Sequence, residues 1–233
     1  MSIAEKLTQV AENVPKVYDA GYSKAERYAW DLFTNYGART FYEYGFYGTG
    51  FEYIRPPYKI VSTARGLSVF GRCSVLKAVE KEYIDFSQCS VTSQSADVNG
   101  WYSTFFLCNA LEIVEDIGMQ AGGYYRTFNR CPNLHTIEVM RVKENTKYDG
   151  TFTNCYELVN LTIEGTIGQN GFDVSYCTKL SHDSLMSIIN ALKDYSNDTS
   201  GTQWIVALGR ANLDKLSDTE IAIATQKGWG LSE

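Results

Sequence analysis

The sequence has no long apolar run, no apolar leader and no excess of basic residues, and each absence excludes a class of protein. No stretch of the 233 residues reaches the length of about 18 apolar residues that a membrane-spanning helix needs, so membrane insertion is not expected. The first residues, MSIAEKLTQVAENV, lack the apolar core of a secretory signal, which predicts synthesis in a reducing cytoplasm. With 21 basic against 27 acidic side chains the net charge is −6, so nucleic acid is not an expected partner.

The sequence also lacks the motifs that carry catalysis. Its two histidines, His135 and His182, stand far apart in the chain. No nucleophile elbow, phosphate-binding loop or His-Glu-x-x-His motif occurs. The Gly-Thr-Gly at 48–50 lacks the strand and helix that flank a dinucleotide-binding turn. We therefore expect no enzyme activity, no cofactor and no metal.

What the sequence does have is six cysteines in one register. Four segments align on them: FGRCSVLKAVE (70–80), FFLCNALEIVE (105–115), FNRCPNLHTIE (128–138) and FTNCYELVNLT (152–162). Two degenerate copies, FSQCSVT (86–92) and VSYCTKL (174–180), complete the set. We call the common pattern, Phe-x-x-Cys-x-x-Leu-x-x-[Ile/Val/Leu], the repeat unit. Every cysteine of the chain fills its Cys position.

The spacing of the cysteines is typical of a repeat protein with buried thiols. Successive cysteines lie 16, 19, 23, 24 and 22 residues apart, which is close to the period of about 20–29 residues of leucine-rich repeats. Stacked units would bury columns of Phe, Leu and Cys, and cysteine is a small side chain that is often buried. Disulfides would require arbitrary pairing among equivalent positions, and zinc requires ligands that lie closer together. The pattern predicts six free, buried thiols.

Each unit is expected to combine a tight turn with a strand. Phe-x-x-Cys is typical of a helix end or 3₁₀ turn, and the alternating segment after it predicts a half-buried strand. Because each unit returns to the same side before its strand begins, the sheet should be parallel. After the repeats, Ser181 or Asp183 can begin a helix, TQWIVALG (202–209) predicts a strand, and SDTE (217–220) is a capping box. The apolar face of the helix comprises Leu185, Ile188, Ile189 and Leu192.

The segment before the repeats has a different pattern. Apolar residues at 3, 7, 10, 14 and 17 form a heptad seam, which favours a three- or four-stranded homo-oligomer through residues 2–20, with a trimer as the expected form. Pro15 and the short length favour instead a helix packed on its own domain. A second helix is expected over 23–36. The segment 41–58 is rich in tyrosine and phenylalanine, and it is either a cap over the first repeat or a binding site.

One surface position recurs with the same charge. Seven residues after the cysteine of three units stands a glutamate that should point out of the sheet. The degenerate unit at Cys89 is expected to separate the first of these glutamates from the other two. Like charges on neighbouring strands repel, so the row is either solvated surface or a docking face for a basic partner. The candidate ligand-binding face comprises Glu80, Glu115 and Glu138, with Thr136 and Met140 expected to be exposed beside them.

The repeat motif resembles a known family. FTNCYELVNLTIEGTIG (152–168) is similar to the BspA-type leucine-rich repeat, which occurs in bacterial surface adhesins and in phage-encoded proteins. The opening MSIAEKLTQVAENVPKVYDAGY and the closing segment from 180 onward are similar to short prophage proteins of this type from Gram-positive gut bacteria. The likeness covers nearly the whole chain. Since the adhesins carry a signal peptide and an anchor, this sequence is more similar to the phage-encoded group.

The resemblance implies an α/β fold: a leucine-rich-repeat solenoid with a parallel sheet on one face, N-terminal helices and a C-terminal cap of helix and strand. The expected parts are a helical segment (1–37), an aromatic-rich cap (38–68), the repeats (69–180) and a C-terminal cap (181–233). It implies a non-enzymatic protein made in the bacterial cytoplasm without a signal peptide and associated with a virion. There it would bind a protein or a cell-surface glycan, at the virion surface or tail. The alternatives are an intracellular interaction scaffold and, with less support, a cell-wall-active enzyme.

Overall fold

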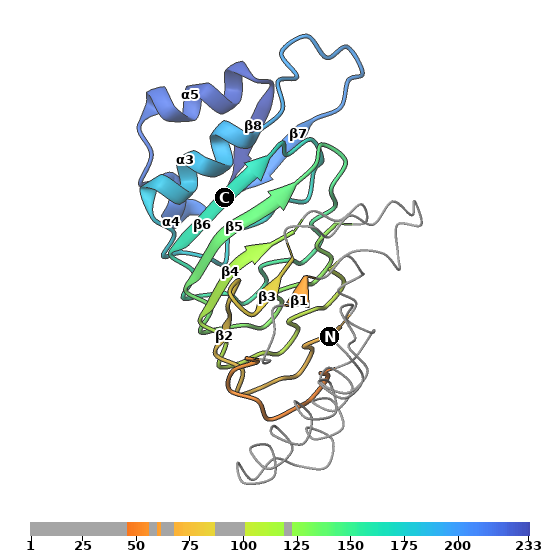
Figure 1. The fold of residues 1–233 in the computed structure, drawn as a ribbon. Coiled ribbons are helices and arrows are strands. Elements are labelled where there is room, and N and C mark those ends of the chain that lie inside the picture. The colour runs from red at the N-terminus through yellow and green to blue at the C-terminus, as the bar shows by residue number, and fades with distance from the viewer. Residues whose placement is uncertain (1–45, 56–59, 62–67, 87–100, 119–122) are drawn as a thin grey trace, which may run out of the picture.

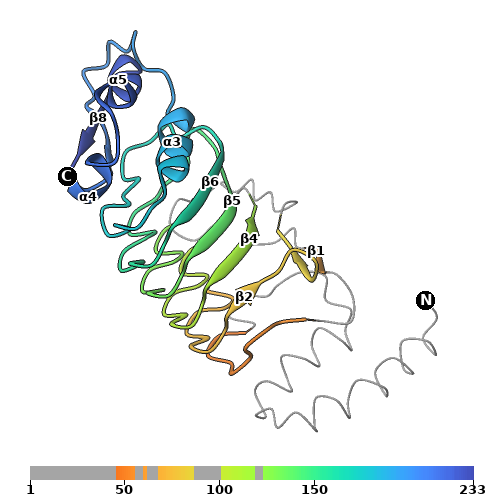
Figure 2. The ribbon, with the colours of Figure 1, turned by 90° about the vertical axis from the view of Figure 1, so that its left-hand side faces the viewer.

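The protein has a mixed α/β fold built on a four-stranded parallel sheet (Figure 1). The computed structural model describes residues 46–55, 60–61, 68–86, 101–118 and 123–233. Within them the sheet runs in the order β2 (Ala78–Val79), β4 (Ile113–Ile117), β5 (Thr136–Val142) and β6 (Asn160–Gly165). All three pairings are parallel, which confirms the prediction from the repeat units. Figure 2 shows β4, β5 and β6 side by side, with the turns that precede them at one end.

Two smaller sheets and three helices complete the described elements. The short strands β1 (Ile60–Val61) and β3 (Ile84–Asp85) pair in parallel, as do β7 (Trp204–Ala207) and β8 (Trp229–Ser232). The helices are α3 (His182–Ala191), α4 (Arg210–Leu213) and α5 (Asp218–Gln226). In both views α3 lies against β6, and the remaining C-terminal elements lie beyond it (Figures 1 and 2).

The core contains a column of stacked phenylalanine rings, to which each of the four well-conserved repeat units contributes one. Successive ring centroids lie 5.3 to 5.9 Å apart along the series Phe46, Phe70, Phe105, Phe128 and Phe152. Each ring is buried, and stacked aromatic pairs add stability beyond their buried area. Phe46 belongs to the aromatic segment before the repeats, so the column extends into that segment. Thr49 stands there at the position that a cysteine fills in the later units, and it is also buried.

The cysteines form a second column, in which thiols bond to the neighbouring unit. Five of the six lie in the described part, and all five are buried and free, as predicted. The Sγ of Cys108 donates to the backbone oxygen of Phe70 at 2.9 Å, and the same bond recurs from Cys73, Cys131 and Cys155 at 2.8 to 3.0 Å. Cysteine therefore fits this position because it is small and because it carries a hydrogen-bond donor.

The turn that precedes each strand uses left-handed backbone twice. In four units the residue five positions before the cysteine and the residue one position before it both have φ between 48° and 65°. Left-handed backbone costs most residues about 1–2 kcal/mol, and only Gly and Asn adopt it easily. Gly150 and Asn154 are of the favoured types. The other residues in these positions are Ser68, Arg72, Ser103, Leu107, Arg126 and Arg130.

Helix α3 covers the outer edge of the sheet. Its N-cap is Ser181, one of the two predicted starts, and all four residues of the predicted apolar face are buried. Two serines of the helix accept hydrogen bonds from the free edge of β6: Leu161 N donates to Ser184 Oγ and Ile163 N donates to Ser187 Oγ, each at 2.8 Å. The unpaired N–H groups of an exposed strand edge can pair with another chain, and these serines accept hydrogen bonds from two of them. The predicted strand at 202–209 and the Ser217 capping box are also confirmed.

Several predictions fall outside the described residues. They concern the heptad seam at 2–20, the helix over 23–36, the ends of the aromatic segment (41–45 and 56–58) and the degenerate unit at Cys89.

Candidate functional site

The three predicted glutamates do lie on neighbouring strands. The register pairs Val79 with Val114 and Val114 with Ile137, so the residues that follow them, Glu80, Glu115 and Glu138, come side by side. The expected separation of Glu80 from the other two is wrong, because β2 pairs directly with β4.

The row is nevertheless not a uniform acidic stripe. Arg55 donates two hydrogen bonds of 2.7 Å to the Glu80 carboxylate, and this partner lowers the pKa of Glu80. Glu115 is half-buried and accepts a 2.6 Å hydrogen bond from the backbone N–H of Lys81. Glu138 is exposed and has no ion pair among the described residues. Of the three, Glu138 alone is exposed and has neither an ion pair nor a hydrogen bond among the described residues.

Met140 was expected to be exposed on this face, and that prediction is wrong: its side chain is 0% exposed. The cause is an irregularity in β5. The register of β5 against β6 shifts between Ile137 and Met140, so that Glu138 and Val139 together oppose one residue of β6. Such a bulge inserts one residue and inverts the alternation of sides beyond it. Thr136 precedes the bulge and stays half-exposed on the outer face.

A buried ion-pair network that the sequence reasoning missed ties the strands together. The Asp116 side chain is 1% exposed and lies 2.6 Å from Lys81 Nζ and 3.1 Å from Arg141 Nη1. Arg141 also contacts Glu164 of β6 at 3.2 Å. The hydrogen bond to Asp116 raises the pKa of Lys81. Because a buried carboxylate needs such partners, this network is structural. Its signal in the sequence was an aspartate within a strand, where that residue is rare.

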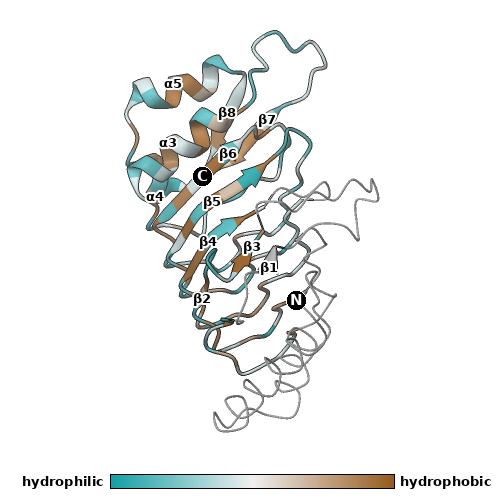
Figure 3. Ribbon diagram, in the orientation of Figure 1, coloured by the Kyte–Doolittle hydropathy of each residue, from teal (hydrophilic) through white to brown (hydrophobic). Residues whose placement is uncertain are grey.

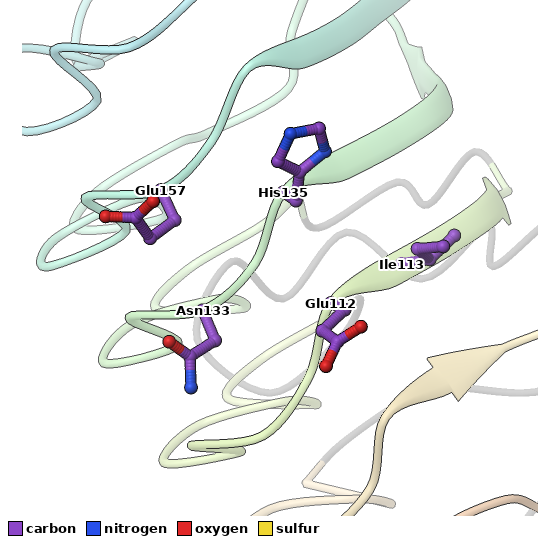
Figure 4. Close-up of a pocket in the computed structure, with 5 residues that line it drawn as sticks. All are labelled: Glu112, Ile113, Asn133, His135 and Glu157. Atoms are coloured by element: carbon purple, nitrogen blue, oxygen red, sulfur yellow. The ribbon is translucent and has the colours of Figure 1, made fainter.

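Two open depressions lie where the strands begin. The larger, of about 500 Å³, is lined by residues that precede or open β4 and β5 and by one residue of the next turn (Figure 4). Glu157 is bound to Lys179 at 2.6 Å, whereas Glu112 has no ion pair within the described ranges. Ile113 supplies an apolar wall and is 38% exposed. The lining residues are Glu112, Ile113, Asn133, His135 and Glu157.

The second depression, of about 440 Å³, lies between β5, β6 and the start of α3. Thr136 connects the second depression to the first. The Thr136 Oγ lies 3.0 Å from Nδ1 of His135, which lines the first depression, and accepts a hydrogen bond from Asn160 Nδ2 at 3.2 Å. Figure 3 shows hydrophilic segments among hydrophobic ones along these strands. The residues that line the second depression are Thr136, Glu138, Asn160, Leu161, Thr162, Ser181, Asp183 and Ser184.

The two depressions form one polar surface, which we call the strand-start face. Its exposed carboxylates without a Lys or Arg partner in the described structure are those of Glu112, Glu138 and Asp183. Hydroxyl and amide groups surround them. Such a surface suits a partner that carries positive charge and hydrogen-bond donors. Of the predicted residues it includes Thr136 and Glu138, and it leaves out Glu80, Glu115 and Met140.

The aromatic segment contributes mainly to the core. Between 46 and 55, Phe46 and Phe51 are buried, and Phe46 stacks on the first repeat. Tyr47 and Tyr53 are exposed, and Arg55 packs over the Tyr53 ring at 4.3 Å. In its described part the segment therefore offers two tyrosines, and no continuous aromatic surface.

Metal-binding groups and membrane-spanning helices are both absent from the described ranges. Within the described ranges no three His, Cys, Asp or Glu side chains form a group that could hold a metal ion. None of the helices that the structure describes is long and apolar enough to cross a membrane. Comparison of the chain with protein-family models, with curated proteins and with solved structures finds no match in any of the three.

Proposed function

We propose that the protein is a non-enzymatic leucine-rich-repeat solenoid that binds a basic partner through the strand-start face. The phenylalanine column, the thiol bonds between units and the parallel strands support the solenoid part of this proposal. Stacked repeats commonly present an extended face as a docking surface. The observation that carries the binding part is the group of uncompensated carboxylates at Glu112, Glu138 and Asp183.

The charges of the described part favour this surface over the rest of the sheet. Glu80, Asp116 and Glu164 each bind a basic side chain of the same molecule. At the strand-start face, Glu112 and Glu138 pair with no Lys or Arg among the described residues, and Asp183 faces only His182 Nδ1, at 3.9 Å. A partner would therefore meet the charge of these three carboxylates directly. A site of this kind increases the rate and the specificity of association more than the final affinity.

The setting of this binding is proposed from the resemblance to BspA-type repeats in phage-encoded proteins. We place the protein at the surface or tail of a virion, where it would bind a host-surface component. The rival proposal is an intracellular scaffold that never joins a particle. Mass spectrometry of purified particles from an induced lysogen distinguishes the two, because only the virion proposal predicts the protein in the particle fraction.

The binding proposal is tested by charge reversal on the full chain. Fluorescently labelled protein should sediment with intact Gram-positive cells, and the paired change Glu112→Lys and Glu138→Lys should reduce the bound fraction. A matched pair, Glu82→Lys and Asp218→Lys, reverses two other exposed acids and should bind like the wild type. Raising the salt concentration above about 0.15 M should weaken wild-type binding, because the Debye length falls below about 8 Å. Equal binding by both double variants would refute the assignment of this face.

A further inference from the structure

The arginines of the described structure fall into two groups that occupy different places. One group binds carboxylates: Arg55 pairs with Glu80, Arg141 with Asp116 and Glu164, and Arg210 with Asp214 and Glu233. The other group has no carboxylate within ion-pair distance among the described residues. Its members all lie on the turns of the repeat units: Arg72, Arg126 and Arg130.

The turn arginines are unusual because the chain as a whole is acidic. The net charge is −6, so acceptors for ion pairs are abundant, yet these three exposed side chains have none in the described part. They also stand at left-handed positions, with φ of 59°, 51° and 62°. Other units place Ser, Leu, Gly or Asn at the same positions, so the turn itself does not require arginine.

Two of these arginines flank a cavity. The cavity has a volume of about 260 Å³ and is lined by Phe106, Arg126, Asn129 and Arg130. Phe106 belongs to the unit before, is half-exposed and lines the same cavity as the two arginines. Arg126 also packs over the ring of Tyr125, with its Cζ 5.1 Å from the ring centroid.

The lining groups offer three different contacts. A guanidinium group binds a carboxylate through two parallel hydrogen bonds, and here two such groups lie at one cavity. The Phe106 ring provides an apolar face. The amide nitrogen of Asn129 donates to Gly150 O at 3.4 Å, which leaves its oxygen as an acceptor for a hydroxyl group.

We propose that this turn cavity binds an acidic sugar of a polysaccharide, with its carboxylate on Arg126 and Arg130. The ring of the sugar packs its apolar face on Phe106, and a hydroxyl group donates to Asn129. The volume is below the range of about 300–1,000 Å³ typical of small-molecule pockets, so it suits one sugar ring of a chain that continues along the surface. The two arginines alone would suit an acidic peptide as well, and the aromatic ring beside them favours a sugar, whose apolar face packs on it.

The cavity is separate from the strand-start face, since the two share no lining residue. They also bind opposite charges. The proposal therefore goes beyond the proposed function, and its failure would leave the acidic face untouched. The variants of each site serve as controls for the other.

The test is a titration of the full-length protein with oligogalacturonate, a chain of acidic sugars, by isothermal calorimetry. The double variant Arg126→Gln and Arg130→Gln should lower the affinity by about tenfold or more, because each lost hydrogen bond to a charged group weakens binding substantially. The matched variant Lys143→Gln and Lys147→Gln removes two other exposed positive charges and should bind like the wild type. Circular dichroism checks that both variants fold.

Two further arms separate sugar recognition from simple charge attraction. A neutral oligomer of glucose should not bind, and polyglutamate of equal charge should bind more weakly than oligogalacturonate. Phe106→Ala should reduce the affinity for oligogalacturonate and leave that for polyglutamate unchanged. The proposal is overturned if oligogalacturonate does not bind, if the lysine variant loses as much affinity as the arginine variant, or if polyglutamate binds equally well with the same response to Phe106→Ala.

Discussion

Substitutions at Cys131 and Cys177 should separate the contribution of the thiol hydrogen bond from that of burial. Both side chains are 0% exposed and fill the same position of their units. The Sγ of Cys131 donates to Phe105 O at 2.9 Å, whereas Cys177 makes no thiol hydrogen bond within the part of the chain that the structure describes. The two sites thus form a matched pair that differs mainly in one bond.

Alanine at either site removes one buried sulfur. This loss resembles that of a methylene group, about 0.8 kcal/mol, plus a cavity term, or about 1–2 kcal/mol in all. Cys131→Ala also removes a hydrogen bond of about 0.5–1.5 kcal/mol. Phe105 O keeps a second donor, the backbone N–H of Cys108 at 3.1 Å, so no carbonyl is left without a partner. Cys131→Ala should therefore cost more stability than Cys177→Ala, by about 0.5–1.5 kcal/mol.

The two serine variants should rank in the opposite order of stability loss from the two alanine variants. At Cys131 its hydroxyl can donate to Phe105 O, and the bond between the units is kept. At Cys177, where the thiol makes no hydrogen bond with the described residues, we expect the hydroxyl to be buried without a partner, which costs about 1–3 kcal/mol. Cys177→Ser should thus be the more destabilising of the two serine variants, although Cys177→Ala is the less destabilising alanine variant.

Urea unfolding followed by the fluorescence of the four tryptophans measures all four variants. For each variant, the slope of the free energy of unfolding against urea concentration must agree with that of the wild type before the free energies are compared. The reasoning is refuted if the two sites rank in the same order in the alanine and the serine series. In that case burial alone, and no thiol bond, would explain the cysteine column.

Predictions for Cys155, Ser184 and Arg55 rest on burial and on other contacts of the described structure. Burial raises the pKa of the Cys155 thiol to about 12 from an ordinary value of 9.0, so iodoacetamide should label it only after denaturation. Since only the unfolded chain then loses this proton near pH 9, the free energy of unfolding should fall as the pH rises above that value. Ser184→Ala leaves Leu161 N–H unpaired at the sheet edge and should cost about 1–3 kcal/mol in the same urea assay. Arg55→Gln should raise the pKa of Glu80 in an NMR titration, because Arg55 is the main cause of its lowered value.

The candidate site was only partly predictable. The spacing of the glutamates from the cysteines placed Glu138 correctly, because a regular repeat fixes which side of a strand each residue faces. Met140 was misplaced because a bulge depends on how two strands pair, and no residue of β5 announces it. Glu112 and Asp183 were missed because they come together only through the stacking of β4, β5 and α3.

The sequence by itself determined which side chains form the core. Phe, Cys and Leu recur at fixed offsets, and burying each column requires that neighbouring units stack in one register. The parallel sheet, the free thiols and the start of α3 at Ser181 follow from such local patterns. The tertiary structure alone decided which charges are compensated. Arg55 reaches Glu80 from 25 residues away, while Arg126 and Arg130 reach no carboxylate in the described part. Ion pairing depends on distances between units of the stack, and a one-dimensional pattern does not contain those distances.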